Sequence, residues 1–397
     1  MSNLKQGKPQ MHTDEHGCGF LEKLLDLSAE QAGGAEVEWV ALGELCTIQT
    51  GKLNANASDA DGKFAFFTTA REPSRINRYR WDTEALLIAG NANIGEVKHF
   101  EGKFEAYQRT YVLTSFNDEV NVKFLYYCVA ANLKKYLESH TKKAAMTYIV
   151  LSSLKSFPIP IPCPDNPEKS LAIQAEIVRI LDTFTELTTE LTTELTARKK
   201  QYNYYRDQLL TFEEGEVEWK TLGEVFQMRA GQHISASKIM DNAGDGHIYP
   251  CFGGNGIRGY VQEKSHEGEY LLIGRQGALC GNVHRMKGQF YATEHAVVVV
   301  PNREINIDWA FHVLTLMNLN KYKSQSAQPG LAVGKLQGLE IPVPSLTKQA
   351  RIVAILDKFD TLTHSISEGL PREIDLRQKQ YEYYRDLLLN FPKSEPQ

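Results

Sequence analysis

The chain is a tandem duplication, and this constrains its fold more than any other feature of the sequence. The segment VEWVALGELCTIQTG begins at Val37 and returns as VEWKTLGEVFQMRAG at Val217. QAEIVRILDTF at Gln174 returns as QARIVAILDKF at Gln349. A repeat of about 180 residues is far longer than the roughly 20–50 residues of a solenoid unit. Each copy is therefore predicted to be a domain followed by a connector.

Each copy has two parts of different character. The first part mixes short apolar runs with glycine-rich turns, as in EALLIAGNANIGEVKHFEGKF, and predicts mostly strands with some helix. The proline-rich segments FPIPIPCP and EIPVPS are expected to end this part, and a helical connector follows. The predicted boundaries are an N-terminal segment with a short helix at 1–36, a first domain at 37–157, a central helical spacer at 158–216, a second domain at 217–340 and a C-terminal helical spacer at 341–397.

The central spacer is predicted to be one long helix with a coiled-coil seam. Its apolar side chains recur at steps of three or four, near a 3.5-residue period. A helix from 171 to 212 would be about 60 Å long. The run ELTTELTTELTA repeats a four-residue unit and is interpreted as a ruler that sets the distance between the two domains. The stripe consists of Ile177, Ile180, Phe184, Leu187, Leu191, Leu195, Tyr202, Tyr205, Leu209 and Phe212.

The two ends of the chain depart from a plain repeat. The C-terminal spacer contains EGLPRE, where Gly369 and Pro371 are predicted to interrupt the helix. At the N-terminus, FLEKLLDLSAEQAGGAEVEW resembles the end of the first spacer, YYRDQLLTFEEGEVEW. The chain is therefore interpreted as beginning inside a repeat. The alternative is an unrelated short amphipathic helix.

A tyrosine-rich decamer, QYNYYRDQLL, begins at Gln201 and returns as QYEYYRDLLL at Gln380. Residues three apart share a helix face, so Tyr202 and Tyr205 are expected in the seam. Tyr204 points elsewhere and, with Arg206, favours a partner surface, because Tyr and Arg are enriched at interface hot spots. The second copy supplies the equivalent pair, Tyr383 and Arg385.

Composition restricts the classes of partner. Residues 158–216 hold 6 Lys and Arg against 11 Asp and Glu, whereas 37–157 hold 15 against 13, so any nucleic-acid surface must be local. The sequence contains no apolar run of about 18 residues and no apolar signal core, which predicts a cytoplasmic protein without a membrane span. The six cysteines are scattered without a C-x-x-C pair and fit reduced thiols.

Motifs for catalysis are weak. CFGGNG, from Cys251, matches a cofactor-loop pattern of adenosylmethionine-dependent methyltransferases, but IRGYVQ follows and predicts a turn and strand in place of a helix. GNANIGEV has P-loop-like glycines but lacks the required Lys and Ser or Thr. His12, His16 and Cys18 could imitate a metal site, but no fourth ligand is nearby. No catalytic triad or carboxylate pair can be selected from spacing.

The sequence signals for nucleic-acid binding are stronger than those for catalysis. Arginine can hold phosphates or read guanine edges, and Asn and Gln can address adenine. The alternatives are a solvated arginine loop and glycines required only for tight turns. The candidates in the first copy, which include the segment REPSRINRYRW, are Arg71, Arg75, Arg78, Arg80, Asn91, Asn93 and Arg109. The candidates in the second copy are Asn255, Arg258, Tyr260, Arg275, Gln276, His284 and Arg285.

Taken together, the order and duplication of these segments resemble the specificity subunit of type I restriction–modification systems, from about 37 to 391. The resemblance implies an α+β fold with two target-recognition domains, each mixed α/β, separated by two long helices that pack as an antiparallel coiled coil with a pseudo-two-fold repeat. Each domain would read one half of a bipartite site in double-stranded DNA. Two methyltransferase subunits and the restriction subunits would dock on this chain.

The resemblance also implies that adenosylmethionine is bound by the methyltransferase partner and that this chain holds no cofactor. Two other classes of function remain open at this point. One is an enzyme, either a fused specificity–methyltransferase polypeptide or a nuclease whose site is not visible in the sequence. The other is a scaffold whose domains bind only protein.

Overall fold

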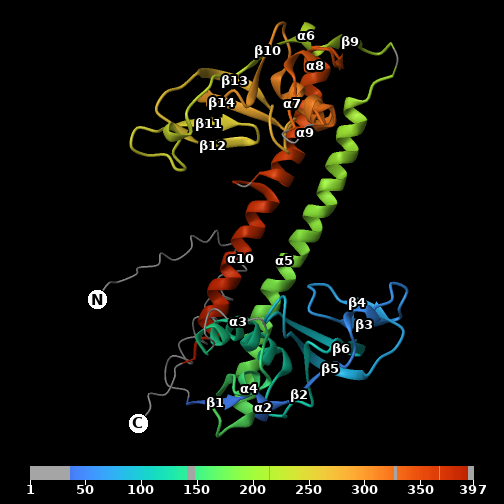
Figure 1. The fold of residues 1–397 in the computed structure, drawn as a ribbon, viewed down its shortest axis with the longest axis vertical. Coiled ribbons are helices and arrows are strands. Elements are labelled where there is room, and N and C mark those ends of the chain that lie inside the picture. Colours follow the sequence, from blue (N-terminus) through green and yellow to red (C-terminus); the bar gives the residue numbers. More distant parts are fainter. Residues whose placement is uncertain (1–35, 141–147, 214, 326–328, 366, 392–397) are drawn as a thin grey trace. The chain divides into compact units, whose positions relative to one another are not determined.

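The computed structural model describes residues 36–140, 148–213, 215–325, 329–365 and 367–391. The chain divides into two compact units, unit 1 with residues up to 190 and from 374 onward, and unit 2 with residues 191–373 (Figure 1). Each unit therefore takes helical segments from both copies of the repeat. The short helix predicted before residue 36, and the residues His12, His16 and Cys18, lie outside the described residues.

Unit 1 is built on a six-stranded mixed sheet with the strand order β2-β7-β5-β6-β3-β4. Only β3 and β6 run parallel, and the other neighbouring strands are antiparallel. The strands are β2 (Thr47–Thr50), β3 (Phe64–Phe67), β4 (Ser74–Ile76), β5 (Trp81–Ala89), β6 (Val97–Ala106) and β7 (Thr110–Thr114). The helices of this part are α2 (Leu42–Leu45), η1 (Ala55–Ala57), α3 (Val122–His140) and α4 (Leu151–Lys155).

Unit 2 repeats this topology with the order β10-β15-β13-β14-β11-β12. The duplication in the sequence is therefore a duplication of the fold. The strands are β10 (Phe226–Ala230), β11 (Tyr249–Gly253), β12 (Gly256–Val261), β13 (His266–Gly274), β14 (Val283–Ala292) and β15 (Ala296–Pro301). The helices are α6 (Leu222–Val225), η2 (Ala236–Lys238), α7 (Ile307–Leu316), η3 (Leu319–Tyr322) and α8 (Val333–Gln337).

The proline-rich segments form strands, which the sequence analysis did not predict. β8 (Pro158–Pro162) pairs antiparallel with β1 (Val37–Ala41), and β16 (Glu340–Val343) pairs in the same way with β9 (Glu218–Thr221). A proline lacks the backbone N–H, so it is tolerated only where no ladder bond is needed. In PIPIP the prolines alternate, and the buried Ile159 and Ile161 lie between them. Each segment thus closes its domain instead of following it.

A buried glutamine anchors the helical connector to the domain in both units. The Gln174 side chain accepts a hydrogen bond from the Asn121 backbone N–H at 2.8 Å, and Gln349 accepts one from Asn306 at 2.8 Å. Both glutamines are at most 1% exposed. Asn121 and Asn306 in turn cap the helices α3 and α7 through their side chains. The repeated motif Q-A-x-I-V is therefore explained by one duplicated anchor.

The connectors are largely helical, as predicted. α5 spans Pro167–Leu210 as one helix, whereas the C-terminal connector is divided into α9 (Leu346–His364) and α10 (Gly369–Leu388). The predicted interruption is confirmed. Gly369 has φ of +75°, and a Cβ there would lie 2.4 Å from the Thr361 carbonyl oxygen, so the break between the two helices requires glycine at this position.

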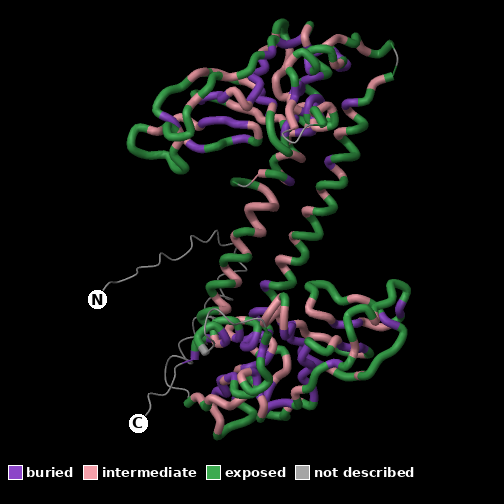
Figure 2. The backbone as a smooth tube through the Cα atoms, in the orientation of Figure 1, coloured by how far each residue is buried: buried purple, intermediate pink, exposed green. Residues whose placement is uncertain are grey.

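Along α5, burial follows the predicted stripe (Figure 2). Ile177, Ile180 and Phe184 are buried in the core of unit 1. Leu187, Leu191 and Leu195 are half-buried, whereas the glutamates between them are exposed. Among the described residues, no helix has both the length and the hydropathy that a membrane span requires.

The decamer of each repeat packs on the helix of the other repeat. In unit 1, Tyr384 of α10 stacks on Phe184 of α5, with ring centroids 5.4 Å apart. In unit 2, Tyr205 of α5 stacks on Phe359 of α9 at 5.5 Å. Tyr202 is only 4% exposed, as expected for a seam residue, whereas Tyr205 keeps 39% of its surface exposed.

Candidate nucleic-acid interface

Three loops that connect strands of the unit 1 sheet are tied to one another. These are 68–73 after β3, 90–96 between β5 and β6, and 107–109 between β6 and β7. The Asn93 side-chain amide donates to the Thr69 carbonyl at 2.7 Å, and the Gly90 N–H donates to the Arg109 carbonyl at 2.8 Å. We call these three loops the reading edge of unit 1.

Unit 2 brings together the matching segments 253–256, 274–282 and 293–295, its reading edge. The Asn282 amide donates to the Asn255 side-chain oxygen at 2.9 Å, and the Arg275 N–H donates to the His295 carbonyl at 2.8 Å. A Cβ on Gly254 would lie 2.3 Å from the Gln276 carbonyl oxygen. Glycine is therefore required for this close approach.

The four clustered arginines of unit 1 separate into two kinds. Arg75 donates to the carbonyls of Gly62 and Lys63 at 2.7 and 3.3 Å, which holds it to the backbone. Arg80 lies 4.5 Å above the Trp81 ring and contacts the Thr50 carbonyl at 3.5 Å. Both Arg75 and Arg80 therefore make contacts within the fold.

Arg71 and Arg78 are exposed, and neither guanidinium has a hydrogen bond or ion pair within the described residues. They are thus available for an external anion. Arg71 lies in the reading edge, whereas Arg78 lies between β4 and β5. Arg109 is exposed as well, and Asn91, half-buried, has a buried Oδ1 without a hydrogen-bond donor among the described residues.

The predicted residues of unit 2 also fall into groups. Asn255, Arg258 and Gln276 are exposed at or beside the reading edge, and Arg275 is half-buried within it. Tyr260 lies farther along β12, where its backbone pairs with Met240 at 2.7 and 2.9 Å. It therefore does not join the reading edge.

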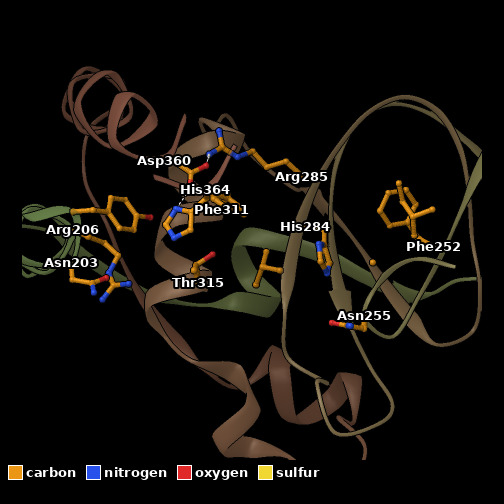
Figure 3. A pocket seen from close by; sticks show the side chains of 14 residues that line it. Asn203, Arg206, Phe252, Asn255, His284, Arg285, Phe311, Thr315, Asp360 and His364 are labelled. Atoms are coloured by element: carbon orange, nitrogen blue, oxygen red, sulfur yellow. Dashed lines mark hydrogen bonds and ion pairs between the residues drawn. The ribbon is translucent and has the colours of Figure 1, made fainter. Parts of the chain in front are cut away.

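His284 is half-buried, and its Nε2 has no partner within the described residues. Burial lowers its pKa below the ordinary value, so the ring is neutral at pH 7. It contacts Gly256, where a Cβ would lie 3.3 Å from the imidazole. His284 therefore lines the wall of a hollow of about 780 Å³ between the sheet and the helices of unit 2 (Figure 3).

Arg285 faces the helices of unit 2. Its guanidinium contacts Asp308 at 3.0 Å, Asp357 at 2.8 Å and Asp360 at 3.1 Å, and lies 4.1 Å above the Phe311 ring. The guanidinium nitrogens that could contact DNA are therefore already bonded to these carboxylates. We therefore assign it a role in the fold and leave it out of the proposed DNA contacts.

Sequence reasoning missed three features of the site. The first is the hydrogen bond by which Asn282 holds the side chain of Asn255. The second is a pair of exposed apolar side chains near these asparagines, Ile257 and Leu279, which are 57% and 51% exposed. The sequence did show the asparagine in ALCGNV, but no periodicity marked it. The third feature is the cluster of aspartates around Arg285. It joins three segments that are far apart in the chain, so no local sequence pattern indicates it.

The weak catalytic motifs are loops of the two six-stranded sheets. CFGGNG forms the tight turn of the hairpin β11–β12, and GNANIGEV connects two antiparallel strands, so neither opens a helix. Within the residues that the structure describes, no group of three or more His, Cys, Asp or Glu side chains is arranged to hold a metal.

The predicted partner-binding residues have similar exposure and contacts in the two copies of the decamer, one in α5 and one in α10. Tyr204 is 62% exposed and Tyr383 44% exposed, each with a T-shaped contact to the next tyrosine. Arg206 forms an ion pair with Asp207 at 2.8 Å and lies 5.7 Å from the Tyr202 ring centroid. In the second copy, the corresponding distances for Arg385 are 2.6 Å to Asp386 and 5.8 Å to the Tyr381 ring.

Comparison with known proteins agrees with this architecture. The family model described as type I restriction modification DNA specificity domain matches residues 35–199 and again 214–376. The specificity subunit of type I restriction enzyme EcoprrI from Escherichia coli is 53% identical over 378 residues, which cover 88% of this chain and 92% of that protein. The EcoR124I/EcoR124II specificity subunit, also from Escherichia coli, is 38% identical over 95% of this chain and 98% of its own length.

Solved structures show the same fold. The S subunit of a type I restriction–modification system from M. genitalium aligns with a TM-score of 0.64 at 18% identity, over 91% of this chain and 98% of that chain. The matching family model covers both copies of the repeat, and the two Escherichia coli relatives match nearly end to end. The chain therefore belongs to the specificity subunits of type I restriction–modification systems, the non-catalytic components that recognise DNA.

Proposed function

We propose that each six-stranded sheet reads one half of a bipartite site in double-stranded DNA through its reading edge. The observation that carries this proposal is that the two units have the same strand order and an equivalent backbone tie between two of the loops, but different side chains on the loops. Unit 1 offers Arg71, Asn91, Asn93 and Arg109, and unit 2 offers Asn255, Arg258, Arg275 and Gln276. Arg78 and His284 remain candidates beside these edges.

These residue types can read base edges in the major groove. Arginine pairs with guanine, and Asn and Gln pair with adenine, each through two hydrogen bonds. A scaffold that holds different side chains on equivalent loops would let the two half-sites differ in sequence. The proposed domains keep the boundaries 37–157 and 217–340, with β8 and β16 added to the domains that they close.

The helices would form an antiparallel coiled-coil spacer between the two recognition domains. The stacks Phe184–Tyr384 and Tyr205–Phe359 support this arrangement within each unit. The half-buried Leu187, Leu191 and Leu195 would continue the seam. The length of this seam would then set the gap between the two half-sites.

Two methyltransferase subunits would dock on the matched surfaces around Tyr204 with Arg206 and Tyr383 with Arg385. Restriction subunits would join this assembly, and adenosylmethionine would be bound by the methyltransferase. This chain would carry no cofactor and would work in the cytoplasm. Exposed aromatic rings beside arginines are typical of interface hot spots.

The direct test is an assay of DNA methylation and footprinting with purified proteins. This chain alone, with adenosylmethionine and DNA, should transfer no methyl group. Addition of the methyltransferase should give methylation at one bipartite sequence and a footprint that is absent without this chain. Methylation by this chain alone would show an enzyme, and an unchanged footprint without it would show a protein scaffold.

The docking surfaces are tested by changing Tyr204, Arg206, Tyr383 and Arg385 together to alanine. Co-purification with the methyltransferase should fall, whereas helicity should stay unchanged because the two tyrosines are exposed and the two arginines are only half-buried. Lys200→Ala combined with Lys379→Ala, at exposed positions just before the decamers, is the matched control. Unchanged stoichiometry and affinity in the fourfold variant would exclude the docking role.

A further inference from the structure

The strand β14 of unit 2 is tied to two helices by a cluster that we call the arginine clamp: Arg285, Asp308, Asp357 and Asp360. Arg285 lies in β14, Asp308 in α7, and the other two aspartates in α9. One guanidinium thus meets three carboxylates at 2.8–3.1 Å. A planar guanidinium with several fixed acceptors defines an orientation more strictly than apolar packing does.

A second layer of contacts fixes the carboxylates themselves. The fully buried His312 contacts Asp357 through Nε2 at 2.9 Å. Its Nδ1 lies 3.4 Å from the Tyr202 hydroxyl of α5. His364 contacts the other acceptor, Asp360, at 3.2 Å. The clamp is therefore supported from α5, α7 and α9 at once.

The clamp stands beside the hollow of about 780 Å³ in unit 2 (Figure 3). Phe252, Asn255 and Ile257 line the hollow on the sheet side, and Asn203 and Arg206 line it on the helix side. Side chains do not fill the space between these two walls. The clamp lies beside this hollow and adds a polar tie to the apolar core in which Leu271 and Val283 of the sheet pack with the helices.

Unit 1 has a different residue at the equivalent position. His99 faces Leu86 in the register of β5 and β6, just as Arg285 faces Leu271 in β13 and β14. His99 contacts Glu84 of the neighbouring strand at 2.7 Å instead of a helix. In the described part of unit 1, no ion pair joins the six-stranded sheet to the helices.

We propose that Arg285 is a positioning residue that sets the angle at which the reading edge of unit 2 meets DNA, a device that the described part of unit 1 does not have. This inference rests on the proposed function, because it assumes that the sheet reads a half-site. Arg285 itself touches no base. It acts through the placement of Asn255, Arg258 and Gln276.

The test compares methylation by the assembled complex with Arg285→Met, which keeps an unbranched apolar side chain and removes the charge. The substrates carry single mismatches in either half-site, or a gap one base pair shorter or longer. Arg285→Met should lower discrimination against mismatches in the unit 2 half-site by about tenfold, the scale of one charge-assisted hydrogen bond, and should relax the gap preference. Discrimination at the unit 1 half-site should stay unchanged.

Three further variants make the outcome decisive. Arg285→Lys should restore part of the discrimination, because an ammonium can still meet one carboxylate. His99→Met, at the matched position, should leave both half-sites unchanged. If Arg285→Met does not fold, Asp360→Asn removes one carboxylate and leaves the other two contacts, and it should give the same half-site-specific effect at smaller size.

Equal losses at both half-sites, or an unchanged mismatch and gap profile in a folded variant, would overturn the positioning role. Failure of the proposed function looks different, because the wild-type complex would then recognise no bipartite site at all. Thermal unfolding of each variant separates lost stability from altered recognition.

Discussion

Asp182 in unit 1 and Asp357 in unit 2 occupy the same place in the repeat but have different partners. Asp182 accepts hydrogen bonds from Lys123 at 2.6 Å and Tyr127 at 2.7 Å, both from α3. Asp357 contacts His312 of α7 at 2.9 Å and Arg285 of strand β14 at 2.8 Å. Tyr127 and His312 are equivalent, because each follows its capping asparagine by six residues.

The comparison shows which interactions a duplicated fold keeps and which it changes. In both units the glutamine anchor accepts its hydrogen bond from the backbone N–H of the capping asparagine, so this bond is kept, although the glutamine amide groups donate to different acceptors. The aspartate bonds to side chains, so its partners have diverged. The divergence links strand β14 to the helices in unit 2, with no equivalent ion pair among the described residues of unit 1, and it brings a titratable histidine into the core of unit 2.

The largest effect is expected from a change that leaves both units intact and alters only their connection. The boundary between the units falls within ELTTELTTELTA, after Glu190. Deleting residues 190–193 removes about one helical turn, roughly 6 Å of rise and about 40° beyond a full circle. A base-pair step is about 3.4 Å, so we expect both half-site sequences to persist with a gap shorter by about one base pair. Methylome sequencing measures the gap.

The control for the deletion is Thr192→Ala combined with Thr193→Ala, which keeps the length of α5. It should retain the original gap. An active deletion complex that also keeps the original gap would refute the ruler, because flexible joints would then absorb the lost turn.

A smaller effect, confined to unit 1, is expected from the exposed arginines. Arg71→Ala or Arg78→Ala should weaken DNA binding by about 1–3 kcal/mol and leave the thermal unfolding midpoint unchanged. A base-reading arginine would relax one position of one half-site, and a phosphate contact would weaken all sequences and flatten the salt dependence. Titration of labelled DNA at several salt concentrations distinguishes these two cases.

Arg75→Ala is the matched control, because Arg75 bonds to backbone carbonyls in the fold. Arg75→Ala should lower the free energy of unfolding by about 1 kcal/mol. It should reduce the affinity for DNA less than Arg71→Ala or Arg78→Ala does. If these three substitutions and Arg80→Ala all leave affinity unchanged, the segment REPSRINRYRW is a solvated loop.

The smallest effect is a pH dependence specific to unit 2. Burial lowers the pKa of His312, although its bond to Asp357 opposes this, and burial also lowers the pKa of His284 and His266. Below pH 6.5 the unfolded chain takes up protons that these folded histidines do not accept, so the free energy of unfolding falls as the pH decreases. The loss is at most about 1.4 kcal/mol per pH unit for each histidine.

Hydrogen exchange resolved by peptide measures this difference between the units. Between pH 7 and pH 5, protection in α7 should fall more than protection in α3, after correction for intrinsic exchange. His312→Gln should reduce the difference, and His99→Gln should not. Equal losses in α3 and α7 would contradict the assignment to unit 2.

Much of the fold could be predicted from the sequence because its signals are local or repeated. The duplication predicted two equal domains, the apolar stripe predicted α5, and Gly369 with Pro371 predicted the break between α9 and α10. The strands β8 and β16 were missed, since a proline-rich segment is typical of a terminator and gives no sign of its pairing partner more than a hundred residues away.

The candidate site was predictable only in part. Exposed polar residues in glycine-rich loops indicated the reading edges, and the structure brings Asn255 and Gln276 together there. It also shows that Arg75 and Arg285 have partners inside the fold. Which arginine faces solvent depends on contacts between segments far apart in the chain, and one sequence contains no record of these contacts.

The central claim is that each unit reads its own half-site, and an exchange of one domain tests it most directly. Residues 52–155 would be replaced by the equivalent segment of another specificity subunit, and the methylome of cells that express the complex would be sequenced. We predict a new sequence in one half of the methylated site, with the other half and the gap unchanged. A change in both halves, from a complex that is still active, would contradict the claim.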